Sequence, residues 1–185
     1  MADGGARPTV AHSLLPEMLR TRHLLLRPFS GEDGRAVYAF WSSDPGWARF
    51  NESVPDDFDD GDADDFVRTM MARDRTEAPG WALVHGERVV GVVGLSFAEN
   101  RCSAVLGFGI HAELRGRGFC GEAVACVLDA AFAAERSLDV VLARTDRRNR
   151  PSMRVLEKLG FAEEREPSGA LFRLTRASWR PLDAS

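Results

Sequence analysis

The sequence is short of cysteine and of lysine. Its three cysteines are Cys102, Cys120 and Cys126, and their odd number and unpaired spacing argue against a disulfide framework and against a zinc site. Reduced thiols and no bound metal are therefore expected. Lys158 is the only lysine in the chain, and this preference for arginine indicates a high-GC, bacterial genome and not a function.

Long hydrophobic runs and blocks of basic residues are also missing. The apolar runs between Met1 and Leu19 are too short for a signal peptide or a membrane span, so we expect a cytoplasmic protein without a membrane partner. A formal net charge of -4 with no block of Lys and Arg argues against nucleic-acid binding, while a small anionic ligand stays allowed. For 185 residues, 44% of them hydrophobic, we expect a flexible N-terminal tail over residues 1–19 and one domain over residues 20–180.

Hydrophobic periodicity predicts both strands and helices. Ser30 and Asp33 are candidate N-caps of the first helical segment. The predicted elements, in chain order, are strand 22–28, a helical segment that reaches Trp41, strands 81–85, 89–97 and 102–111, helix 118–135, strand 138–145, a helix that starts at Asn149 or Ser152 and stops at Gly160, and strands 161–165 and 170–175. This order predicts an α+β fold with a mixed sheet and not a doubly wound sheet.

The strongest charge run is the acidic segment 56–65. A calcium loop is excluded, because an EF-hand alignment on Asp56 and Gly61 puts Phe58 and Val67 at positions that need ligands. We interpret the segment as a solvated loop whose last carboxylates favour a helix N-terminus. The alternative, a rim that attracts cationic acceptors, stays open.

A glycine-rich turn, Arg115-Gly116-Arg117-Gly118, lies between an apolar strand and an amphipathic helix. Glycines at such a place let the backbone approach an anion, and the free amides of the helix N-terminus supply partial positive charge. Arg115 and Arg117 add full charges suited to phosphate. The alternative is an ordinary tight turn, since the pattern matches neither a P-loop nor a dinucleotide fingerprint.

Further motifs surround this turn. They are Leu24–Pro28, Leu106–Ile110, Glu122-Ala123, Asn149–Ser152 and Leu156–Phe161. Together with the turn they resemble the GCN5-related N-acetyltransferases (GNAT), most closely the ribosomal-protein branch of RimJ and RimL type, over residues 20–176. The resemblance implies the GNAT fold, with a mostly antiparallel sheet of six to seven strands, flanking helices and a splay between strands four and five.

The resemblance also implies acetyl-CoA as the co-substrate and no metal. The residues implied to bind it are Phe108, Gly109, Ile110, Arg115, Gly116, Arg117, Gly118, Phe119, Cys120, Gly121, Asn149 and Ser152. Ser152 stands where the family often places a hydroxyl that protonates the leaving thiolate. A serine there could equally be only a helix cap.

Two positions depart from the family pattern. Cys120 replaces the usual small residue of the pyrophosphate loop, and Val105 replaces a frequent glutamate that activates water. Direct attack needs a neutral amine, so the loss of that base favours an α-amine, with a pKa of about 8, over a lysine-like amine near 10.4. No replacement base is identified among the candidates, which are Glu52, Glu99, His85 and His111.

The acceptor pocket could be lined by four aromatic residues, Trp47, Phe50, Trp81 and Phe97, although a place in the core is the alternative for each. The predicted function is transfer of an acetyl group to a primary amine, with a protein or peptide N-terminus as the leading acceptor. The alternatives are a small amine, such as an antibiotic or amino-acid analogue, and a non-catalytic CoA-binding regulatory module. A homodimer is compatible with the resemblance, and no residue proves it.

Overall fold

The computed structural model describes residues 15–44, 50, 54–55, 57–167 and 169–181. In chain order the elements are β1 (Leu19–Arg20), β2 (Leu25–Arg27), α1 (Gly34–Ser42), α2 (Asp60–Ala72), β3 (Gly80–His85), β4 (Arg88–Phe97), β5 (Ser103–Ile110), a short 3-10 helix (Ala112–Leu114), α3 (Phe119–Ala134), β6 (Val140–Thr145), α4 (Arg150–Lys158), β7 (Ala162–Glu164) and β8 (Ala170–Thr175).

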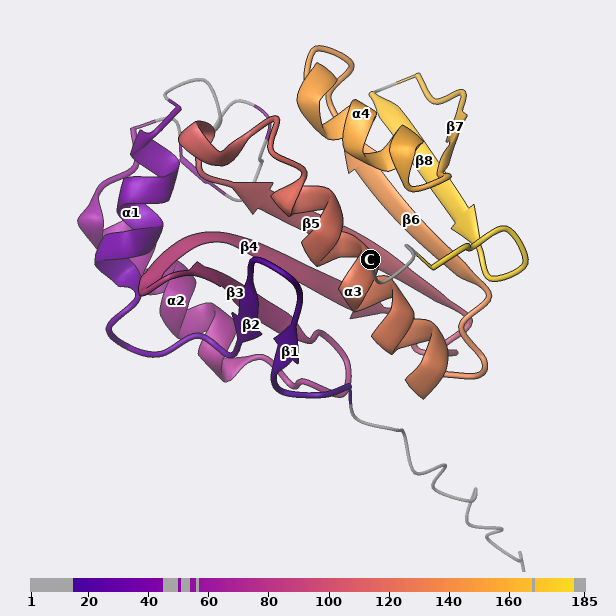
Figure 1. Cartoon of the computed structure of the whole chain (residues 1–185), viewed down its shortest axis with the longest axis horizontal. Helices are drawn as coiled ribbons and strands as arrows, with labels where there is room; N and C mark the ends of the chain where they lie inside the picture. Colours follow the sequence, from indigo (N-terminus) through magenta and orange to yellow (C-terminus); the bar gives the residue numbers. More distant parts are fainter. Residues whose placement is uncertain (1–14, 45–49, 51–53, 56, 168, 182–185) are drawn as a thin grey trace, which may run out of the picture.

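The strands of the described residues form one mixed sheet of eight strands in the order β1-β2-β3-β4-β5-β6-β8-β7. Every neighbouring pair is antiparallel except β5 and β6, which are parallel. Figure 1 shows the long β4 curving across the middle of the molecule, with α3 in front of the sheet. The predicted α+β fold with a mostly antiparallel sheet is confirmed.

Helices cover both faces of the sheet, and the strands alternate between them. In β3, Trp81 and Leu83 belong to the larger apolar core with α3 and α4, whereas Ala82 and Val84 belong to a second core with α1 and α2. This alternation follows from the two-residue period of a strand. The residues of β3 from Gly80 to Val84 are therefore all buried.

Two details differ from the sequence-based expectation. The sheet has eight strands and not six to seven, because the two-residue β1 pairs with β2 through Leu19↔Leu26 and Arg20↔Leu25. The acidic run leads into a helix N-terminus as predicted, but α2 takes up its whole second half from Asp60, so less of the run is loop than expected. There Asp59 and Asp62 make a reciprocal capping box, with Asp62 N donating to Asp59 at 3.0 Å and Asp59 N donating to Asp62 at 2.9 Å.

The described part of the predicted N-terminal tail packs against the domain. Leu15 is buried at 4% exposure. The indole Nε1 of Trp81 donates to the carbonyls of Pro16, at 3.2 Å, and of Glu17, at 3.1 Å. The prediction for residues 1–14 lies outside the described residues.

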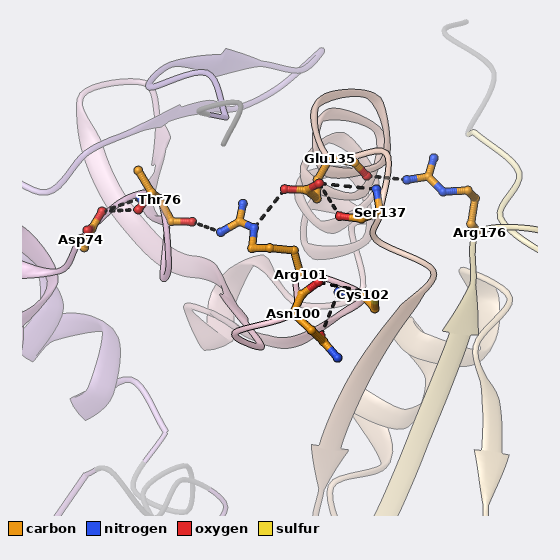
Figure 2. A network of polar contacts seen from close by, with 8 residues as sticks. All are labelled: Asp74, Thr76, Asn100, Arg101, Cys102, Glu135, Ser137 and Arg176. Carbon is orange, nitrogen blue, oxygen red and sulfur yellow. Dashed lines mark hydrogen bonds and ion pairs between the residues drawn. The ribbon is translucent and has the colours of Figure 1, made fainter. Parts of the chain in front are cut away.

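A buried polar network joins the far ends of several elements (Figure 2). Arg101, in the β4–β5 turn, has a φ of 61° and donates from Nε to the carboxylate of Glu135 at 2.9 Å, just beyond α3. It also donates to the carbonyl of Thr76 in the loop before β3. On the other side of Glu135, Arg176 donates to one carbonyl in the last turn of α3, that of Phe132, and to two carbonyls just after the helix, those of Glu135 and Leu138.

Candidate active site

The two parallel strands of the sheet separate toward their carboxyl ends. β5 and β6 are paired only at Ser103↔Val140, Ala104↔Val141 and Val105↔Leu142. Beyond Val105, β5 stays paired with β4 up to Ile110, and β6 stays paired with β8 up to Thr145. The edge of β5 that faces β6 therefore has no strand partner from Leu106 onward, and Figure 1 shows the two arrowheads diverging.

A cleft of about 1080 Å³ opens at this splay. Its walls come from the β1–β2 hairpin, the end of α1, the second half of β5, the glycine-rich turn, α3, the end of β6 and α4. Many predicted cofactor residues line it, and they are Phe108, Gly109, Ile110, Arg115, Gly116, Gly118, Cys120, Gly121, Asn149 and Ser152. Arg117 and Phe119 do not line the cleft: Arg117 is exposed, and Phe119 is buried at 8% exposure in the larger core.

The glycine-rich turn lines the cleft with backbone that no side chain of its glycines covers. Gly116 has a φ of 77° and Gly118 a φ of 86°, both in the left-handed region that favours glycine. Gly118 is the N-cap of α3. A Cβ built on Gly116, Gly118 or Gly121 would meet no protein atom within 4 Å, so the side chains missing there leave open space beside the helix N-terminus. A diphosphate fits this geometry, because its charge would face the first amides of α3.

Arg115 also ties α1 to this turn. Its guanidinium donates to the carboxylate of Asp44 at 2.5 Å. One residue earlier, the Ser43 hydroxyl accepts a hydrogen bond from the backbone of Ala112 at 3.0 Å. The charge of Arg115 is thus shared between the cleft and α1, and the end of α1 is fixed against the loop that starts α3.

Ser152 lies in the first turn of α4 and lines the cleft. The helix is capped by Asn149, whose side-chain oxygen accepts from the Ser152 backbone at 3.3 Å. This arrangement settles the choice of N-cap and leaves the Ser152 hydroxyl with no hydrogen bond to another described residue. That hydroxyl is consequently available to a ligand in the cleft.

Cys120 is a cleft residue whose thiol is kept neutral. Burial raises the pKa of Cys120 to about 12, against the opposing charge of Arg115. A thiolate nucleophile is excluded at this pKa near neutral pH.

The pairing of His23 with Glu122 was not predicted from the sequence. The backbone N of His23 donates to one oxygen of Glu122 at 2.8 Å, and its ring nitrogen lies 2.8 Å from the other oxygen. The His23 ring also stacks on Phe119 at 4.9 Å between centroids. These contacts fasten the β1–β2 hairpin to the first turn of α3, and nothing in the local sequence signals a contact between residues 99 positions apart.

Burial would raise the pKa of Glu122, but hydrogen bonds from His23 and Thr21 outweigh burial, and the pKa lies below the ordinary value. The Glu122 carboxylate is thus already bonded by residues of the β1–β2 hairpin. It is not a free base for the cleft.

The predicted acceptor residues lie in different places. Phe50 lines the cleft, and the Arg148 guanidinium lies 6.0 Å from its ring centroid. Trp81 is fully buried in the core, and Phe97 packs under Arg101 at 4.0 Å, so neither lines the cleft. Trp47 lies outside the described residues.

The three candidate bases that the structure describes are likewise not in the cleft. His85 packs against the Phe119 ring at 5.0 Å, and Glu99 is exposed in the β4–β5 turn. His111 caps the short 3-10 helix, where its Nδ1 accepts from the Glu113 backbone at 3.4 Å. The remaining candidate, Glu52, lies outside the described residues.

A mixed sheet opened between two parallel strands, with a glycine-rich turn leading into the helix that crosses it, defines an acetyltransferase-type α+β enzyme. The chain belongs to the GNAT acetyltransferase family, since the family model described as "Acetyltransferase (GNAT) domain" matches residues 23–162. A comparison with curated proteins found no match.

Solved structures share the fold at low identity. A GNAT-family acetyltransferase from Bacillus anthracis matches with a TM-score of 0.72 at 21% identity, covering 85% of this chain and 98% of that one. The microcin C7 self-immunity acetyltransferase MccE, solved with acetyl-CoA and AMP, gives 0.74 at 14% identity over 88% and 98%. RimJ of Mycobacterium smegmatis, solved with a CoA disulfide, gives 0.67 at 19% identity over 83% and 82%.

Proposed function

We propose that this enzyme transfers the acetyl group of acetyl-CoA to a primary amine, and that its acceptor is the α-amine of a protein or peptide N-terminus. The observation that carries the proposal is the cleft at the β5–β6 splay. It joins an open strand edge, a glycine-rich helix start and the free hydroxyl of Ser152 in one continuous space.

Acetyl-CoA fits the cleft by its chemistry. The amides at the start of α3 would hold the pyrophosphate, with Gly116, Gly118 and Gly121 leaving room for it. The unpaired edge of β5 from Leu106 to Ile110 offers backbone groups to the amide-rich pantetheine arm. The complexes of MccE with acetyl-CoA and of RimJ with a CoA disulfide support this assignment.

Acetyl-CoA would supply the acyl group as a thioester. Backbone amides on the free edge of β5 are then in a position to stabilise negative charge on the carbonyl oxygen. As the C–N bond forms and the C–S bond breaks, the amine nitrogen would lose a proton to solvent, and the Ser152 hydroxyl would donate a proton to the departing sulfur and regain one from solvent. Holding both reactants in one cleft supplies much of the rate enhancement.

The described part of the cleft offers no uncommitted carboxylate as a base. Asp44 is paired with Arg115, Glu122 with His23, and Asp129 accepts from the Trp179 indole at 2.8 Å. Val105, where a glutamate would stand, is 48% exposed on β5. A site without a base favours an amine that is partly neutral in the cell, which describes an α-amine with a pKa of about 8.

We also propose a RimJ/RimL-like acceptor preference and a cytoplasmic location. The fold shared with RimJ and the three free cysteines of the described chain are compatible with both.

The experiment measures CoA release from acetyl-CoA with a thiol reagent, in the presence of peptides with a free N-terminus, N-terminally blocked peptides that carry lysine, and small amines. We expect turnover with free N-termini, reduced roughly 10²-fold or more in Ser152→Ala because a general acid is lost. Ser152→Thr keeps the hydroxyl and serves as the control. Turnover confined to small amines would show that the acceptor is a small amine and not a peptide N-terminus. Binding of CoA without turnover on any amine would favour a regulatory module.

A further inference from the structure

The cleft contains more positive charge than a pyrophosphate site at the start of α3 requires. Among the described residues, six Arg and Lys side chains line it, and they are Arg20, Arg22, Arg115, Arg144, Arg154 and Lys158. Arg115 is paired with Asp44, and Arg144 lies 3.2 Å from Glu166. The side chains of the other four form no ion pair or hydrogen bond with another described residue.

These four side chains form two pairs on different walls. Arg20 and Arg22 belong to the β1–β2 hairpin, and Arg154 and Lys158 belong to α4. Residues four apart on a helix are neighbours, and like charges at that spacing repel. Arg154 and Lys158 therefore keep two positive charges together at the cleft without an internal anion, which is the arrangement that a bound phosphate monoester stabilises.

The position of α4 makes Arg154 and Lys158 better placed than the hairpin pair, Arg20 and Arg22, to bind a second phosphate in the cleft. Ser152, Val155 and Leu159 put one face of α4 along the cleft, and Arg154 and Lys158 border that face. Since a helix rises 1.5 Å per residue, Lys158 lies about 9 Å along the axis from Ser152. On the hairpin, Arg20 lies on β1, which is four strand positions from β5 in the sheet, or roughly 19 Å.

The distribution of charge in the cleft also favours the α4 wall as the place of a second phosphate. The carboxylate of Glu122 is bonded to the hairpin residue His23, so an anion near the hairpin would meet a negative charge. No carboxylate of α4 or β6 lines the described cleft. The wall formed by α4 is thus the more favourable place for a second phosphate.

We propose that Arg154 and Lys158 bind the 3′-phosphate of CoA and make the enzyme select CoA over dephospho-CoA. The inference rests on the proposed function, since it concerns the same co-substrate. A phosphate monoester carries about -1.5 to -2 charges at pH 7, so two neighbouring cations bind it more tightly than a single cation does.

The test measures binding of CoA and of dephospho-CoA by titration calorimetry, without acceptor. Four proteins are compared: the unaltered chain, the double variant Arg154→Gln/Lys158→Gln, the rival-wall variant Arg20→Gln/Arg22→Gln, and Arg150→Gln as a control on the same helix that does not line the cleft. Thermal melting checks that each variant folds, and the single variants replace the double one if it does not.

We expect the unaltered chain to bind CoA at least about tenfold more tightly than dephospho-CoA, as expected for charge-assisted hydrogen bonds. The α4 double variant should lose that preference by binding CoA more weakly while binding dephospho-CoA unchanged. Equal binding of both nucleotides by the unaltered chain, or loss of the preference in the hairpin variant alone, would overturn the inference and leave the proposed function standing. Binding of neither nucleotide would overturn both.

Discussion

At the scale of single residues, the conformation of Gly118 is demanding. Its φ of 86° lies in the left-handed region, where a residue with a Cβ is disfavoured by roughly 1–2 kcal/mol. Three positions later, Gly121 lies inside α3 without a positive φ, and a Cβ there meets open space. Two glycines of one motif thus serve different needs.

We predict that Gly118→Ala lowers the free energy of unfolding by about 1 kcal/mol because of this backbone strain. Gly121→Ala is the matched control, and it should leave stability unchanged or raise it by up to about 1 kcal/mol, since alanine favours a helix interior. Urea denaturation measures both. Equal losses in the two variants would show that the turn does not depend on the left-handed conformation.

Val105 stands where the GNAT resemblance implies a glutamate that activates water, directly before the cleft residue Leu106. Without a carboxylate there, the rate with a peptide α-amine should rise with pH and level off above about 8, following the pKa of the acceptor. We predict that Val105→Glu raises kcat/KM at pH 7 roughly tenfold or more by adding a base, whereas the uncharged Val105→Gln does not. The pH range from about 6 to about 9 brackets the pKa of the acceptor amine. A rate that stays constant over this range in the unaltered enzyme would contradict direct attack.

The glycine-rich turn, Asn149 and Ser152 could be located from the sequence because each depends on its immediate neighbours in the chain. His23 could not, since its role comes from a contact with Glu122 across the fold. The resemblance implies an acceptor pocket over the first helical segment and the meander, but Trp81 is buried in the core and Phe97 packs against the core under Arg101. Sequence alone does not distinguish an aromatic side chain in the core from one that lines a pocket.

At the scale of elements, α2 depends on its cap. Asp59 accepts from the Asp62 backbone, and Asp62 returns a bond to the Asp59 backbone. Asp59→Ala removes this reciprocal pair, and we predict a loss of about 1 kcal/mol in unfolding free energy, with Asp59→Asn retaining most of it. Chemical denaturation followed by circular dichroism tests the difference, and an unchanged midpoint for Asp59→Ala would refute the importance of the cap.

The end of α3 depends on the buried pair of Arg101 and Glu135. Their side chains are 7% and 11% exposed, and removing one partner leaves the other charge buried. We predict that Arg101→Met lowers the free energy of unfolding by about 3 kcal/mol. The solvent-screened pair of Arg148 and Asp146 is the control, since Arg148→Met should leave the free energy of unfolding almost unchanged.

The same pair gives a pH dependence. Burial would raise the pKa of Glu135, but hydrogen bonds from Ser137 and Arg101 outweigh it and lower the pKa below its ordinary value of 4.5. A lowered pKa in the folded state means that the stabilisation is present above the unfolded value and is lost as pH falls through the folded one. The free energy of unfolding of the unaltered chain should therefore fall more steeply below about pH 4.5 than that of Glu135→Gln, which has already lost this stabilisation at pH 7. Acid denaturation followed by circular dichroism measures both proteins, and equal pH slopes would show that Glu135 does not contribute.

Elements with strong local signals could be predicted within a few residues. The meander, α3 and α4 carry clear periodicity and bounded ends, and the structure has them where expected. β1 is too short for a periodic signal and exists through pairing with β2. The acidic run predicts a helix start at its last carboxylates, and α2 begins earlier, at Asp60, because the capping box depends on the spacing of Asp59 and Asp62, which charge alone does not indicate.

At the scale of the whole molecule, long-range bonds hold three walls around one cleft. The β1–β2 hairpin is joined to α3 by His23 and Glu122, and α1 is joined to the glycine-rich turn by Asp44 and Arg115. The fourth wall, α4, follows directly from β6 at the splay. The sequence indicates the order of these elements, whereas the bonds between walls emerge only in the fold.

The most direct test of acetyl transfer is mass spectrometry of a peptide with a free N-terminus, incubated with the purified enzyme and acetyl-CoA. The account predicts a product heavier by one acetyl group, carried on the α-amine, formed in step with CoA release and strongly reduced in Ser152→Ala. An unmodified peptide together with unchanged acetyl-CoA, across free N-termini, lysine peptides and small amines alike, would contradict it.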